Sequence, residues 1–206
     1  SISGKSNTSL GTLTGSSLSS GDNNTFVGFE SGKNTSSGGG NSFFGFKSGH
    51  STDSGFSNSF FGSEAGLHNS SGNNNSFYGY QSGYGVSGSG NTEKNSFFGT
   101  QSGFNNTGSF GTFVGALSGY NNTADNNVFV GTESGYTNTT GQNNTFFGYR
   151  SGYKNNTGHS NTFFGFESGF ETNNGNENTF IGHSSGYKNT SGAQNTYLGF
   201  HSGYNN

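Results

Sequence analysis

The chain has 206 residues and a formal net charge of −3, and only 8% of its residues are charged. It contains 40 Gly and 23 Phe but no Pro, Cys, Met or Trp, and 24% of its residues are hydrophobic. This composition excludes an aliphatic globular core, a disulfide framework, a thiolate metal site and a basic surface for nucleic acid.

The sequence is a tandem repeat, and its strict period overrides the low-complexity composition. We number the unit from its Asn, so that its core, Asn-Thr-Phe-Phe-Gly-Phe-x-Ser-Gly-Tyr, occupies positions 1–10. Position 5 is Gly in all twelve units: Gly11, Gly28, Gly45, Gly62, Gly79, Gly99, Gly115, Gly131, Gly148, Gly165, Gly182 and Gly199. Their spacings are 17, 17, 17, 17, 20, 16, 16, 17, 17, 17 and 17, so insertions and deletions fall outside the core. Stacked units behave in this way, and we expect one repeat domain over residues 1–206.

Each unit is expected to contribute a strand at positions 2–4, where aromatic and β-branched residues cluster. In chain order these segments are 8–10, 25–27, 42–44, 59–61, 76–78, 96–98, 112–114, 128–130, 145–147, 162–164, 179–181 and 196–198. The two glycines of each core argue against a helix, and polar spacers such as 154–158 are typical of turns. We predict one pair of strands per unit, stacked as an all-β parallel β-solenoid, or β-roll, of about twelve 17-residue coils. A perimeter of at most about 56 Å favours a flattened, two-sided coil.

Stacking is expected to place equivalent side chains above one another as ladders. The Phe at position 3 is predicted to form the core ladder: Phe26, Phe43, Phe60, Phe77, Phe97, Phe113, Phe129, Phe146, Phe163 and Phe180. The Asn at position 1 is predicted to form a ladder of hydrogen-bonded amides: Asn24, Asn41, Asn58, Asn75, Asn95, Asn127, Asn144, Asn161, Asn178 and Asn195. Glycines at positions 5 and 9 are expected either to need a positive φ or to lie against a backbone that leaves no room for a Cβ.

Position 4 is apolar in every unit and, like position 6, should face away from position 3 on a strand. Its residues are the candidates for self-association: Val27, Phe44, Phe61, Tyr78, Phe98, Val114, Val130, Phe147, Phe164, Ile181 and Leu198, with Leu10 in the first unit. An exposed apolar stripe of this length predicts association about an axis parallel to the rod. The alternative is a bulge that turns positions 3 and 4 both inward.

The chain stops inside a unit, after Gly203-Tyr204-Asn205-Asn206. Solenoids usually cap an open strand edge. We expect either an excerpt of a longer array or a subunit that stacks end to end into a filament.

The segments Asn144 to Gly158 and Asn161 to Gly175 follow the pattern Asn-Thr-Phe-Phe-Gly-(Tyr/Phe)-x-Ser-Gly-(Tyr/Phe) most closely. This pattern resembles repeats in large bacterial surface and fibre proteins. It is also similar to the head repeats of YadA-type trimeric autotransporter adhesins, whose shorter units have an Asn/Ser-x-x-x-Gly core. The resemblance implies a parallel β-roll in a homotrimer and a surface-exposed adhesive or structural rod without catalysis. The units of this chain are longer and richer in aromatic residues.

No catalytic or metal-ligating constellation is evident in the sequence. The five His (His50, His68, His159, His183 and His201) occupy different unit positions and therefore form no ladder. The Ser at position 8 has no repeating His or Asp partner, which a nucleophile would need. We therefore predict no enzyme activity, no cofactor and no metal.

The expected function is that of an extracellular or cell-surface rod, structural or adhesive, or of a filament-forming protein. The expected partners are the protein itself, as a trimer or an end-to-end filament, and surface glycans or a host receptor, but neither nucleic acid nor a membrane interior. Ice binding through the Thr/Ser row at position 2 is the alternative. A disordered Phe-Gly chain is a third possibility, which a fixed unit length argues against.

Overall fold

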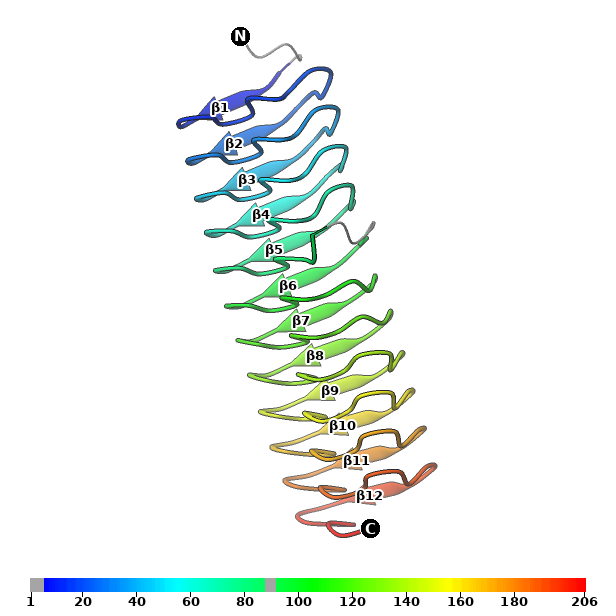
Figure 1. Ribbon diagram of the computed structural model, residues 1–206. Helices are drawn as coiled ribbons and strands as arrows, with labels where there is room; N and C mark the ends of the chain where they lie inside the picture. Colours follow the sequence, from blue (N-terminus) through cyan, green and yellow to red (C-terminus); the bar gives the residue numbers. More distant parts are fainter. Residues whose placement is uncertain (1–5, 88–91) are drawn as a thin grey trace.

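The computed structural model describes residues 6–87 and 92–206 as a stack of coils. Each coil contributes one short strand: β1 (Thr8–Leu10), β2 (Thr25–Val27), β3 (Ser42–Phe44), β4 (Ser59–Phe61), β5 (Ser76–Tyr78), β6 (Ser96–Phe98), β7 (Thr112–Val114), β8 (Val128–Val130), β9 (Thr145–Phe147), β10 (Thr162–Phe164), β11 (Thr179–Ile181) and β12 (Thr196–Leu198). The strands form a single 12-stranded sheet in chain order, and each pairs in parallel with the next (Figure 1). The predicted all-β parallel β-solenoid is therefore confirmed. The described residues include no helix long and apolar enough to cross a bilayer.

The register of the sheet follows the repeat and not the residue count. Phe146 pairs with Phe163 across units of 17 residues. Ser76 pairs with Ser96 across the unit of 20, and Ser96 pairs with Thr112 across one of 16. Equivalent positions therefore stay aligned, because the spacer absorbs every change in unit length.

The prediction of two strands per coil is wrong for the described residues, since only positions 2–4 form strands. The other side of each coil, which we call the second wall, consists of turns. Its backbone amides still form hydrogen bonds from coil to coil. Gly152 N donates to Ser168 O at 2.9 Å, and Lys154 N donates to Phe170 O at 2.9 Å. A left-handed residue at position 7, such as Glu167 with φ 50°, turns the chain before it can extend as a second strand.

The glycines at positions 5 and 9 meet both of the expected constraints. Gly165 has φ +138°, and a Cβ there would lie 2.5 Å from Gly182 O on the next coil. Gly169 has φ +61°, and its Cβ would lie 2.4 Å from the Phe163 ring. A side chain at either position would therefore strain the backbone and overlap the stack.

The interior is a continuous column of Phe rings. All ten rings from Phe26 to Phe180 are buried, and neighbouring centroids lie 4.6–5.0 Å apart with nearly parallel planes. Tyr197 extends the column at a centroid distance of 5.0 Å. Fully burying a side chain such as Phe contributes about 1.5–3 kcal/mol. The Phe column therefore takes the place of the aliphatic core that the sequence lacks.

The Asn at position 1 forms the predicted hydrogen-bonded ladder beside this column. Asn161 N and Nδ2 donate to Asn144 Oδ1 at 2.9 and 3.2 Å, and Nδ2 also donates to Gly175 O at 2.7 Å. Where Gly111 replaces Asn, its backbone N donates to Asn95 Oδ1 at 2.7 Å. Each buried amide thus escapes the cost of an unsatisfied polar group, about 1–3 kcal/mol.

A second Asn ladder, which we did not predict, stands at position 12. Asn122 Nδ2 donates to Asn106 Oδ1 at 2.7 Å, Asn138 Nδ2 to Asn122 Oδ1 at 2.7 Å, and Asn155 Nδ2 to Asn138 Oδ1 at 2.6 Å. The signal for it was the run of Asn at this position in four successive units. It joins the first ladder at Asn127, whose Nδ2 donates to Asn122 Oδ1 at 3.0 Å.

Candidate interaction surfaces

The apolar side chains of position 4 lie on the outer face of the sheet, opposite the buried Phe column. Phe147 is 46% exposed and Phe164 is 52% exposed, whereas Phe146 and Phe163 are 0% exposed. The alternative in which a bulge turns both positions inward is therefore not the arrangement adopted. Position 6 adds a second row of exposed rings: Phe29, Phe46, Tyr80, Tyr149, Phe166 and Phe200. We call the side chains of position 4 the outer stripe.

Stacked rings give the outer stripe a regular surface. Phe44, Phe61, Tyr78 and Phe98 follow one another at centroid distances of 4.7, 4.9 and 4.9 Å. Farther along, Phe147 and Phe164 stack at 4.8 Å. Between these two ring-rich segments, position 4 is Val in β7 and β8. The stripe therefore has two aromatic segments separated by Val, and it is aliphatic at both ends of the stack, where position 4 is Leu10 and Val27 or Ile181 and Leu198.

The Thr/Ser row at position 2 shares the outer face of the sheet with position 4. Its members are half-buried or exposed, and neighbouring residues pair in register, as Thr145 does with Thr162. Val128 interrupts the row, and the rings of position 4 stand beside it. Ice binding through this row stays a prediction.

A further aromatic ladder runs along position 10. Eight half-buried rings stack from coil to coil at 4.7–5.2 Å: Tyr84, Phe104, Tyr120, Tyr136, Tyr153, Phe170, Tyr187 and Tyr204. Burial raises the pKa of Tyr84, Tyr120, Tyr153 and Tyr187 above the ordinary 10.0, so these phenols stay neutral at physiological pH. We call this set the ring ladder.

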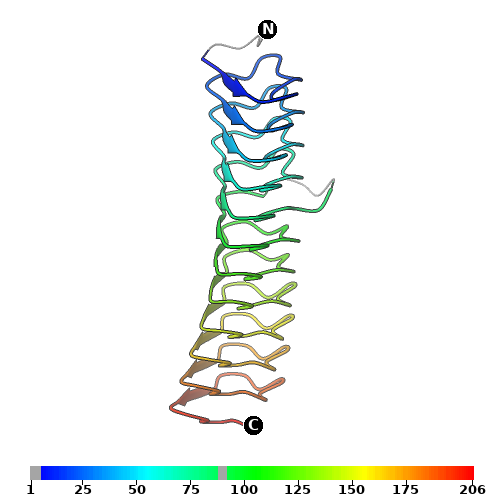
Figure 2. The ribbon, with the colours of Figure 1, turned by 90° about the vertical axis from the view of Figure 1, so that its left-hand side faces the viewer.

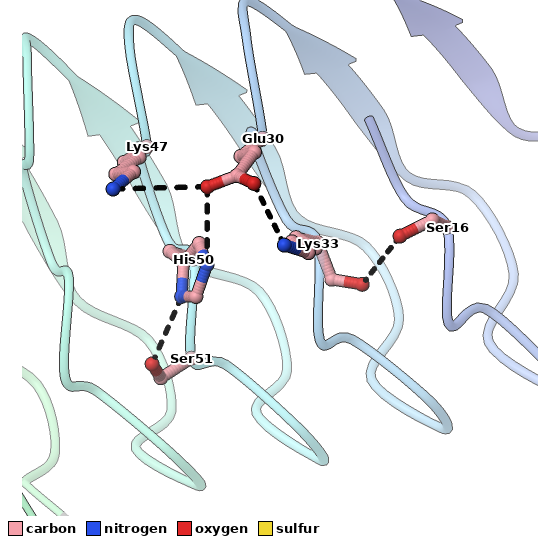
Figure 3. A network of polar contacts seen from close by, with 6 residues as sticks. All are labelled: Ser16, Glu30, Lys33, Lys47, His50 and Ser51. Atoms are coloured by element: carbon pink, nitrogen blue, oxygen red, sulfur yellow. Dashed lines mark hydrogen bonds and ion pairs between the residues drawn. The ribbon is translucent and has the colours of Figure 1, made fainter. Parts of the chain in front are cut away.

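A charged cluster centred on Glu30 crosses the coils near the N-terminal end (Figure 3). Glu30 Oε1 accepts a hydrogen bond from Lys33 Nζ at 2.7 Å, and Oε2 lies 3.7 Å from Lys47 Nζ and 3.5 Å from His50 Nε2. The hydrogen bond from Lys33 lowers the pKa of Glu30. Burial lowers the pKa of His50 although Glu30 opposes the shift, so this ring is neutral at pH 7. The cluster links positions 7 and 10 of adjoining coils.

Acid is expected to weaken this cluster. Because the pKa of Glu30 lies below its ordinary 4.5, its stabilisation is present above that value and is lost as the pH falls through the lowered pKa. The pKa of His50 lies below 6.5, so protonating it below that pH also disfavours the fold. Thermal unfolding at pH 7 and pH 3 should therefore show a smaller acid-induced loss of Tm in Glu30→Gln than in the wild type.

The matched control for this prediction is Glu167→Gln, which changes the same unit position. Glu167 forms no salt bridge within the described residues. This variant should show the same difference in Tm between pH 7 and pH 3 as the wild type does. Full wild-type acid sensitivity in Glu30→Gln would contradict the assignment.

The part of the chain that the structure describes contains no group of three or more His, Asp or Glu that could hold a metal ion. No protein-family model, curated protein or solved structure matches the chain. The geometry of its surfaces is therefore the basis for assigning a function.

Proposed function

We propose that this protein is an extracellular structural or adhesive rod that associates with further copies of itself along the outer stripe. The observation that supports this most directly is the exposed row at position 4, with Phe147 at 46% and Phe164 at 52% exposure. Soluble monomers rarely leave an apolar surface of such length in water. The low charge of the chain, with only 8% charged residues, favours close approach of identical surfaces.

The dimensions of the stripe are sufficient for a specific interface. Eleven steps of about 4.8 Å give a length of about 53 Å, and a width of about 10 Å gives about 500 Å² per copy. Two copies would bury about 1,000 Å² together, which is the lower bound for a stable biological interface. The stripe is therefore large enough for a dimer or trimer only if most of its length is used.

A second copy fits this surface better than an unrelated partner does. Both copies would present rings with the same rise per coil, so a contact made at one coil recurs at the next. Stacked rings such as Phe44 and Phe61, 4.7 Å apart, are held rigid by their neighbours and lose little conformational entropy on association. The resemblance to trimeric adhesin heads makes a homotrimer our first expectation, and an end-to-end filament the second.

Light scattering and sedimentation of the wild type and of the double variant Phe147→Ser, Phe164→Ser test this proposal. Truncating two buried interface rings costs about 1–2 kcal/mol each, so the dissociation constant should rise about 100-fold. The matched control is Phe56→Ser, Phe110→Ser, because these rings are 50% and 47% exposed but lie outside the stripe. Circular dichroism verifies that each variant retains its fold.

The wild type and the control are expected to associate, and the stripe variant is expected to remain monomeric. A wild type that stays monomeric at high concentration would rule out self-association. Equal association of all three proteins would place the interface elsewhere on the rod.

A further inference from the structure

An open groove of about 850 Å³ runs along the rod beside the ring ladder. It lies between two rows of side chains, at positions 11 and 13, to which five successive units contribute both positions. The next unit contributes Thr190 alone, and Val86, at position 12 of an earlier unit, stands at the other end. Its lining residues are Val86, Asn105, Thr107, Asn121, Thr123, Thr137, Thr139, Lys154, Asn156, Glu171, Asn173 and Thr190. Five steps of about 4.8 Å make the groove about 24 Å long. The backbone between the two rows is drawn inward because position 12 is buried, as at Asn122 and Asn138.

The groove offers neutral hydrogen-bonding groups in a repeating arrangement. Amides and hydroxyls line it, and among the described lining residues only Lys154 and Glu171 are charged. These two form an ion pair at 2.7 Å between Nζ and Oε1, so their charges offset each other. Neither a phosphorylated nor a strongly anionic ligand would find a basic partner here. The chemistry fits a neutral ligand with many hydroxyl groups.

Hydrogen bonds between coils fix the orientation of several groove hydroxyls. Thr123 Oγ1 donates to Thr139 O at 2.7 Å, and Thr137 Oγ1 donates to Tyr153 O at 2.8 Å. A hydroxyl that donates inward keeps its acceptor lone pairs for a ligand. Within the described residues, the side chains of Thr107 and Asn173 form no hydrogen bond. The groove is thus preorganised and retains capacity to bind.

Every departure from the 17-residue period lies at one end of this groove. In the unit of 20 residues, Gly85 N still donates to Phe104 O of the next coil at 2.9 Å, and the described chain beyond it projects past the neighbouring turns (Figure 2). Val86, 43% exposed, stands on this extension and lines the groove. The two units of 16 residues follow, each one residue shorter directly after Thr107 or Thr123. The strands pair in the same register across units of 16, 17 and 20 residues, so these changes in length fall in the turns on this side of the coil.

We propose that the groove binds a neutral polysaccharide chain lying along the rod axis. A linear polymer of hydroxyl-rich units matches two parallel rows of amides and hydroxyls, whereas a compact small molecule would need an enclosed pocket. Such a polysaccharide would be the ligand of the proposed adhesive rod, so this proposal rests on that role. The groove is a different surface from the outer stripe, so polysaccharide binding and self-association can be disproved separately.

Affinity electrophoresis in native gels tests the inference, with hydroxyethyl cellulose, galactomannan, xylan and dextran as neutral probes and alginate as the anionic one. At least one neutral probe should retard the wild type, and alginate should not. The variant Asn121→Ala, Thr123→Ala should weaken that binding at least tenfold. The matched control Asn34→Ala, Ser36→Ala changes the same two unit positions outside the groove and should bind as the wild type does.

The monomeric stripe variant Phe147→Ser, Phe164→Ser, run beside these proteins, separates the two proposals. Retained polysaccharide binding by this variant supports the groove whether or not the rod self-associates. The proposal of polysaccharide binding is overturned if no neutral probe binds, if alginate alone binds, or if Asn121→Ala, Thr123→Ala binds like the wild type.

Discussion

Replacing Gly148 with Ala is expected to break the stack between β9 and β10. Gly148 has φ +141°, and a Cβ there would lie 2.3 Å from Gly165 O and 2.6 Å from Gly165 C. Backbone atoms of the next coil cannot move aside without losing the bond from Gly165 N to Phe147 O, which measures 2.8 Å. Backbone strain of about 1–3 kcal/mol adds to this overlap, so the total cost should reach about 3 kcal/mol or more.

Urea unfolding and hydrogen exchange would measure this effect. Each coil contacts only its neighbours, so the damage should be local: amides of β9 and β10 exchange faster, and a separate unfolding transition appears. The matched control is Gly199→Ala, at the same unit position with φ +118°, where a Cβ meets nothing within 4 Å. Equal losses in the two variants would mean that backbone conformation alone requires these glycines, and not the close approach of the next coil.

Replacing Phe146 with Ala is expected to lower the free energy of unfolding by about 3–5 kcal/mol. The ring is 0% exposed and stacks between Phe129 at 4.9 Å and Phe163 at 4.7 Å. Its removal leaves a cavity that the rigid coils on either side cannot close. The loss combines the transfer free energy of the ring with the lost contacts across the cavity.

The adjacent residue provides the control for this prediction. Phe147 is 46% exposed on the other face of the same strand. Phe147→Ala should cost about 1 kcal/mol or less in folding stability, when both variants are measured by urea unfolding of the dissociated protein. Similar losses for Phe146→Ala and Phe147→Ala would show that the interior column is not the main source of stability.

The repeat by itself determined the fold class, the position of the strands and both predicted ladders. A strict 17-residue period requires equivalent residues to stack. The apolar residues at positions 3 and 4 point to opposite faces of the strand, so one is buried in the coil and the other is exposed. Sequence also pointed to Asn161 and its equivalents as a ladder, because an amide can both donate to and accept from its own copy on the next coil.

The tertiary structure alone decided the shape of the second wall. At position 7, residues as different as Leu117 with φ 59°, Arg150 with φ 51° and Glu167 with φ 50° adopt the left-handed conformation. Residue type does not mark this turn, since left-handed backbone favours Gly and Asn. It persists because the stack holds it: Glu167 N donates to Tyr149 O at 2.9 Å on the preceding coil.

The candidate sites likewise differ in whether the sequence alone could predict them. The outer stripe could be predicted, since alternation along a strand is a local property. The groove, the Glu30 cluster and the meeting of the two Asn ladders could not, because they join different unit positions, which come together only through the path of the turns that replace the second strand. The sequence therefore determined which equivalent positions stack from unit to unit, whereas the tertiary structure decided which different positions meet in the turns.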